Sequence, residues 1–188
     1  TNPSLTAFSC PTVPEALFQD CVIRIAPISD ITPLGASDVV SPAIEGFTFE
    51  LNNNLQVRTT KDTGKNIDEP RRQGVPQIGG SIAIPTYGIE NTKFQQWLTE
   101  QTKLMMTIEF TGGEIPPSTG EFYQLTMYFP LVTLTGQNIG VLGPGRIVPG
   151  FSWVAARPTI LPAGFPTNLR GGPIYVELVN KVSSHTLL

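Results

Sequence analysis

Apolar and polar side chains alternate with a period of two in several segments of the chain, the pattern of half-buried β-strands. In the segment GFTFEL, Phe47, Phe49 and Leu51 belong to one face, and Thr48 and Glu50 belong to the other. The same alternation runs through 104–110, 122–129 and 174–179, and weaker strand patterns cover 21–26, 55–60, 77–85, 131–135 and 147–156. The chain is therefore expected to be mainly β.

One segment has a convincing helical pattern. Phe94, Trp97, Leu98 and Gln101 recur at i, i+3, i+4 and i+7, and Asn91 is a suitable N-cap residue. The apolar stripe is narrow, so we expect the helix to lie outside a sheet and to bury only one side. Pro and Gly clusters at 116–117, 143–145, 158–166 and 171–173 separate the later strands.

The strand that begins at Gly46 leads into three asparagines, 52–54, and then into a charged arm, 58–72. The arm holds five of the twelve Lys and Arg residues of the chain. Mixed charge of this kind suits a hairpin or a loop that pairs with complementary charges on a neighbouring copy. A solvated surface loop is the alternative, because long loops are usually either functional or mobile. The predicted contact residues of the arm are Arg58, Lys61, Asp62, Lys65, Asp68, Glu69, Arg71 and Arg72.

Composition narrows the classes of function. With 188 residues and 40% apolar content, the chain can bury a sizeable core. A net charge of −3 argues against a protein that grips nucleic-acid phosphates, although DNA could still slide past such a surface. No apolar run approaches the roughly 18 to 20 residues that span a bilayer, so no membrane partner is predicted.

Signatures of catalysis and metal binding are sparse. His185 is the only histidine and is the fourth residue from the end of the given sequence, so triad chemistry is not expected. Cys10 and Cys21 are too few for a disulfide framework, and we expect both thiols to be reduced and structural. One His and two Cys do not make a zinc site without carboxylates.

Two acidic groupings resemble known sites in part. Asp62, Asn66 and Asp68 alternate like calcium-loop ligands, but Ile67 replaces the sharp-turn glycine and Gln73 replaces the bidentate glutamate. The carboxylates Glu109, Glu114 and Glu121 could suggest hydrolysis, yet strand edges and turns commonly carry such residues. The sequence therefore predicts no enzyme, no metal and no cofactor.

The order of segments resembles that of phage tail tube proteins, the major tail proteins. The resemblance begins with IEGFTFELNNNLQVRTT and EPRRQGVPQIGGSIAI, an alternating strand, an Asn-rich turn, a loop, an Arg-rich step and a second strand. It continues through NTKFQQWLTEQ, LMMTIEF, YQLTMYFPLVTL and PIYVELVN, and covers 39–180. The ordered succession carries the resemblance, because no single piece is as specific as a metal motif.

The resemblance implies a single domain over 1–188, a β-sandwich or partly closed barrel with one flanking helix. It also implies hexameric rings that stack into a hollow tube in the virion tail, assembled in the host cytoplasm. A tape-measure protein and DNA would occupy the lumen without sequence-specific binding, and a sheath or tail terminator could be further partners. By position, the arm would contact a neighbouring subunit or ring.

The segment 1–38 departs from the pattern, because related chains often carry a longer β-rich portion there. The chain starts at Thr1 without Met, so we expect residues to precede it. A distal-tail or baseplate ring component is a related alternative.

A carbohydrate-binding β-sandwich is an alternative from another class. Such a module needs exposed aromatic side chains on one flat face, and Trp153, Tyr123, Tyr128 and Tyr175 are the candidates. Packing in the core and at interfaces is the competing explanation for these side chains.

Overall fold

A computed structural model of the chain describes residues 21–29, 32–40, 43–56, 71–72, 74–85, 89–115, 120–138, 148–166 and 172–179, with the backbone alone at 56 and at 71–72. Its elements are β1 (Cys21–Pro27), the 3₁₀ turn η2 (Ala36–Asp38), β2 (Gly46–Asn52), β3 (Leu55–Gln56), β4 (Arg71–Arg72), β5 (Gln77–Ala83), α1 (Ile89–Thr99), β6 (Lys103–Glu114), β7 (Phe122–Asn138), β8 (Gly150–Ala155) and β9 (Tyr175–Val179). The prediction of a mainly β chain is confirmed.

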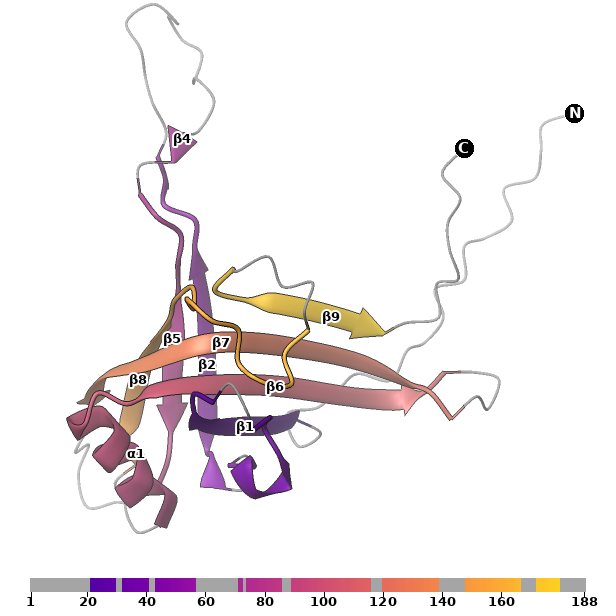
Figure 1. Cartoon of the computed structure of the whole chain (residues 1–188), viewed down its shortest axis with the longest axis horizontal. Helices are drawn as coiled ribbons and strands as arrows, with labels where there is room; N and C mark the ends of the chain where they lie inside the picture. The colour runs from indigo at the N-terminus through magenta and orange to yellow at the C-terminus, as the bar shows by residue number, and fades with distance from the viewer. Residues whose placement is uncertain are drawn as a thin grey trace, which may run out of the picture.

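Seven of the strands form one antiparallel sheet that folds back on itself. Its order is β1-β6-β7-β8-β5-β2, and β9 pairs with β7 beside β8. In Figure 1 the strands β1, β6, β7 and β9 run across the view, and β8, β5 and β2 cross them steeply. We call the first group layer A and the second group layer B. The sheet does not close, so of the two predicted architectures the sandwich is confirmed and the barrel is not.

Strand β7 passes from one layer to the other at a proline. Up to Tyr128 it pairs with β9, and from Val132 it pairs with β8. Against β6, the partner of Met106 is Phe129 and the partner of Leu104 is Val132, so β7 has one extra residue beside Pro130. Proline is tolerated at such a bulge because a ladder hydrogen bond is already missing there. Two strands were predicted here, 122–129 and 131–135, and the bulge joins them into one.

The main core lies between the two layers. Aromatic side chains dominate it: the ring of Trp153 is 5.3 Å from that of Phe129 and 6.0 Å from that of Phe47, centroid to centroid. The other fully buried members come from β1, β5 to β8, the helix and the residue that follows β5 by one position, and they are Ile23, Ile25, Ile82, Ile84, Phe94, Leu104, Met106, Ile108, Val132 and Phe151. The apolar faces predicted for β2 and β6 are thus the faces that line this core.

A second, smaller cluster covers the opposite face of layer A. Met105 and Phe165 are its buried members, and Leu34, Tyr128 and Tyr175 pack around them. The segment around Phe165 lies over the strands here, and Ala163 donates a backbone hydrogen bond to Ser29 at 2.9 Å. Layer A is therefore apolar on both faces at its centre, which explains why β6 is buried continuously from Leu104 to Ile108.

Helix α1 covers one end of the sandwich, as predicted, but its start differs from the prediction. Asn91 is the third helical residue, not the N-cap, and its buried side chain accepts a hydrogen bond from Gln95 at 2.7 Å. Phe94 and Trp97 are buried, and the ring of Phe94 is 5.4 Å from that of Phe151. Gln101 follows the helix with a φ of 51°, so it ends the apolar stripe instead of extending it.

Cys21 is a buried free thiol in β1. Burial raises the pKa of Cys21 to about 11, so the neutral thiol dominates at ordinary pH. This agrees with the expected structural role, whereas Cys10 precedes the described residues.

Candidate assembly surfaces

The charged arm begins from a hairpin at the far end of layer B. Leu55 and Gln56 in β3 pair antiparallel with Arg72 and Arg71 in β4. Figure 1 shows β4 beyond the ends of β2 and β5, away from both layers. A two-residue pair of strands buries little, so this part of the chain has no evident role in the core.

The three asparagines form the joint between layer B and the hairpin. The side chain of Asn52 accepts a hydrogen bond from the backbone N–H of Asn54 at 2.9 Å. Asn54 has a φ of 48° and donates its side-chain N–H to the carbonyl of Val75 at 2.6 Å. Asparagine tolerates this left-handed conformation better than most residues. The predicted Asn-rich turn therefore redirects the chain and ties its two passes together.

Of the predicted contact residues, only the backbone of Arg71 and Arg72 is described, in β4. The other six, Arg58, Lys61, Asp62, Lys65, Asp68 and Glu69, lie outside the described ranges. Their role in subunit contact stays a prediction, and so does the interpretation of 62–73 as a charged loop without calcium.

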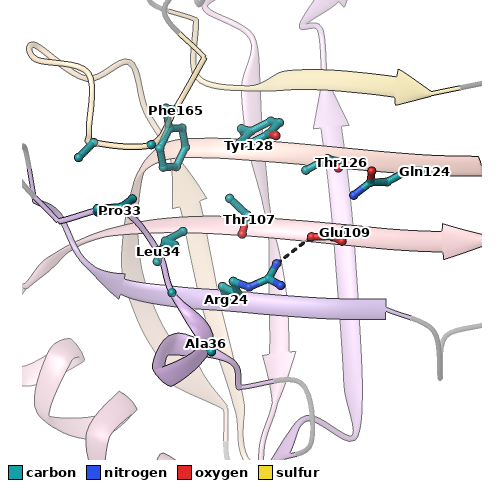
Figure 2. Close-up of a pocket in the computed structure, with 13 residues that line it drawn as sticks. Arg24, Pro33, Leu34, Ala36, Thr107, Glu109, Gln124, Thr126, Tyr128 and Phe165 are labelled. Carbon is teal, nitrogen blue, oxygen red and sulfur yellow. Dashed lines mark hydrogen bonds and ion pairs between the residues drawn. The ribbon is translucent and has the colours of Figure 1, made fainter. Parts of the chain in front are cut away.

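A polar groove of about 350 Å³ lies on the outer face of layer A (Figure 2). Its floor includes Thr107 and Thr126, and Arg24 donates a 2.8 Å hydrogen bond to Glu109 there. At one end Tyr128 donates its hydroxyl to Glu177 at 3.2 Å. Burial raises the pKa of Tyr128, and the negative charge of Glu177 raises it further.

The groove has no catalytic arrangement among the residues that line it. The carboxylate of Glu109 is neutralised by Arg24, and Glu114 accepts a backbone hydrogen bond from Gly120 at 3.0 Å. Both carboxylates therefore have structural partners, and the expected lack of catalysis at Glu109, Glu114 and Glu121 stays a prediction. No group of His, Cys, Asp and Glu able to hold a metal ion occurs within the described ranges.

The aromatic residues considered for carbohydrate binding do not form one exposed face. Trp153 is only 1% exposed, because it lies at the centre of the main core, so this candidate was wrong. Tyr128 and Tyr175 pack against each other with ring centroids 5.7 Å apart, on the face opposite to that of Tyr123. A flat stacking platform for sugars therefore does not assemble from these four side chains.

The sequence pattern did not predict the exposure of apolar side chains in two strands. Val176 and Leu178 in β9 were expected on a half-buried face, yet both are exposed. Phe49 and Leu51 in β2 face the core side of layer B and are also exposed. Alternation identified the faces correctly, but it could not show how far the opposite layer reaches.

In the part of the chain described, no helix has the length and apolar character needed to cross a membrane. No protein-family model matches the chain, and no curated protein is similar to it in sequence.

Among solved structures, the SPP1 tail tube superposes with a TM-score of 0.50 at 9% identity, over 74% of this chain and 75% of that chain. The tail of an empty GTA particle with C6 symmetry gives a TM-score of 0.44 at 12% identity, over 73% and 92% of the two chains. The six-fold symmetrised baseplate of the anti-feeding prophage gives 0.44 at 7% identity, over 78% and 92%. Only the first likeness is strong enough to carry an argument about the fold. The chain therefore shares the fold of the SPP1 tail tube protein.

Proposed function

We propose that this chain is a structural virion protein, the subunit of a phage tail tube in which hexameric rings stack into a hollow conduit for DNA. The observation that carries the proposal is the shared fold with the SPP1 tail tube protein, at 9% identity over 74% of the chain. The ordered sequence resemblance over 39–180 supports it independently of the structure.

The surface chemistry suits a structural role without catalysis. In the polar groove the charges of Arg24 and Glu109 compensate each other in an ion pair. The residues that line the groove include no nucleophile paired with a base. A net charge of −3 lets DNA pass without being held by its phosphates. The partners in this proposal are other copies of the chain, a tape-measure protein and DNA in the lumen, and a sheath or tail terminator. The tail would be assembled in the host cytoplasm.

The arm is the element that we assign to contact between copies. Its described base, the pair of β3 and β4, lies beyond the joint at Asn54 and away from both layers. Five of the twelve basic residues lie in the arm, next to three acidic ones, so it can pair with a surface of mixed charge. Charge pairs of this kind fix the relative position of two copies more than they add to the free energy of association.

Replacing Arg71 and Arg72 with glutamate should raise the concentration needed for assembly by about tenfold. This corresponds to a loss of about 1.4 kcal/mol in the free energy of association between two copies. The circular dichroism spectrum and the midpoint of thermal unfolding should not change, because β4 lies outside the sandwich. Assembly is measured by sedimentation and negative-stain electron microscopy.

The matched control replaces Lys103 and Arg157, two exposed basic residues outside the arm, with glutamate. This pair changes the net charge by the same amount. If the control assembles normally and the arm variant does not, the arm is a contact element. Equal assembly of the arm variant and the unmodified protein would show that the arm is ordinary surface.

A further inference from the structure

The polar groove on the outer face of layer A is apolar at one end and rich in oxygen atoms at the other. Pro33, Leu34 and Phe165 line the first end, and Glu109 and Thr126 line the second, as Figure 2 shows. The volume of about 350 Å³ lies within the range of small-ligand sites. The groove therefore suits a ligand that is apolar along part of its length and polar at its tip.

Two threonine hydroxyls in the floor of the groove have no hydrogen-bond partner among the described residues. They belong to Thr107 and Thr126, which are only 8% and 7% exposed. Burying a hydroxyl without a partner is unfavourable, and a native protein seldom leaves such a group unsatisfied. A ligand with N–H donors would supply the missing partner from within the groove.

The oxygen-rich end of the groove has a net negative charge. Arg24 contacts Glu109 through one pair of atoms, Nη1 and Oε2, 2.8 Å apart, which leaves Oε1 of Glu109 without an ion-pair partner among the described residues. Glu109 pairs across strands with Thr126, and Thr126 pairs with Glu177 in β9, so two carboxylates flank one threonine. Glu177 forms no ion pair with any described residue. Two carboxylates and one guanidinium therefore leave one negative charge here.

The hydroxyl of Tyr128 lies in the field of both carboxylates. It donates to Glu177 at 3.2 Å. Burial raises the pKa of Tyr128, and the charges of Glu177 and Glu109 raise it further. The two carboxylates thus act on the same end of the groove, where a cation is favoured over a neutral ligand.

We propose that the polar groove binds a primary ammonium group carried on an unbranched alkyl chain. The three N–H donors of the ammonium suit the Glu109 carboxylate, the Thr126 hydroxyl and the amide oxygen of Gln124, which lie on two neighbouring strands. A guanidinium prefers two parallel acceptors, and Glu109 already presents one oxygen to Arg24. The methylene groups of the chain pack against Leu34 and the rest of the apolar end.

This inference goes beyond the proposed function, because the site lies within one copy and needs no assembly. The ammonium can belong to a free diamine or to a lysine side chain of another protein, since both carry the same group on the same kind of chain. The diamine putrescine represents the first source, and Nα-acetyl-lysine amide represents the second.

Isothermal titration calorimetry at low salt measures the binding of both probes. At least one should bind with a Kd below about 1 mM, and the probe that binds more tightly identifies the source. Tetramethylammonium has the charge but no N–H donor, and butanediol has hydroxyls but no charge. Both should bind at least about tenfold more weakly than the better probe. Equal binding of tetramethylammonium would overturn the inference.

Substitutions place the bound probe in the groove. Thr126→Val should raise its Kd at least about tenfold, because it removes a hydrogen bond to a charged group. Glu177→Gln should raise the Kd about threefold, since an exposed carboxylate contributes less. Glu50→Gln is the matched control, because it removes the same charge from an exposed position in β2, on layer B, and should bind the probe as the unmodified protein does. Thermal unfolding verifies that each variant is folded.

The outcomes separate this inference from the proposed function. If neither probe binds, or if Glu50→Gln weakens binding as much as Glu177→Gln, the inference is overturned, whether or not the protein forms tubes. A protein that stays monomeric and binds a probe less tightly after Thr126→Val would support the ammonium site and overturn the tube.

Discussion

Replacing Gly80 with alanine is expected to destabilise the protein by about 3 kcal/mol, because a side chain at this position overpacks the sheet. Gly80 lies in β5 between β2 and β8. An added Cβ would clash with the backbone carbonyl oxygen of Thr48 and lie 3.0 Å from Cζ2 of Trp153. A backbone atom cannot rotate away, so β2 would have to move off β5. Urea unfolding measures the loss.

The matched control is Gly136→Ala. Gly136 is also a strand glycine, but among the described residues, its two chain neighbours aside, no atom would lie within 4 Å of a Cβ at this position. Its effect should stay within about 0.5 kcal/mol, as for other substitutions that create no clash. Similar stability of the two variants would contradict the close approach of β2 and β5 described for Gly80.

Trp153→Ala is expected to cost about 4 kcal/mol, a large part of the stability of a typical domain. The side chain is 1% exposed and packs between Phe47 of layer B and Phe129 of layer A, so its removal leaves a cavity at the centre of the sandwich. The free energy of unfolding in urea measures this effect.

Val154→Ala is the control for Trp153→Ala, because Val154 is the next residue in β8 and is exposed on the other face. It should cost no more than about 0.5 kcal/mol. Trp153→Phe should cost less than Trp153→Ala, since it keeps an aromatic ring and removes the indole N–H, which has no partner among the described residues. A small effect of Trp153→Ala would contradict its central position.

The core-facing side of β2 and the Asn-rich turn after it were the most predictable features of the fold. The alternation of Phe47, Phe49 and Leu51 correctly identified the core side of β2. The three asparagines were predicted as a turn, because Asn favours left-handed backbone and local hydrogen bonds; Asn54 has a positive φ, and its backbone N–H donates to the side chain of Asn52. These features depend on neighbouring residues alone, so they can be read locally.

Features set by distant parts of the chain were less accessible. Pro130 suggested the end of one strand, whereas the bulge beside it carries β7 from layer A to layer B. Trp153 was considered as a surface residue, because residue type alone does not show which layer covers it. The start of α1 was misplaced because Asn91 is buried within the helix, where its side chain donates to the carbonyl of Ile84 at 3.5 Å, and a capping pattern does not reveal this burial.

The exposed apolar side chains of β2 and β9 illustrate the same limit. Leu178 has the sequence pattern of a core residue and is 63% exposed, since layer B ends before it covers β9. Layer width follows from the number of strands paired in each layer, a property of the whole topology.

Negative-stain electron microscopy of the unmodified protein over a range of concentrations tests the central claim most directly, with size-exclusion chromatography beside it. The tail tube proposal predicts rings of six copies with an open centre, which stack into tubes as concentration rises. Particles that remain monomeric at every concentration would contradict it.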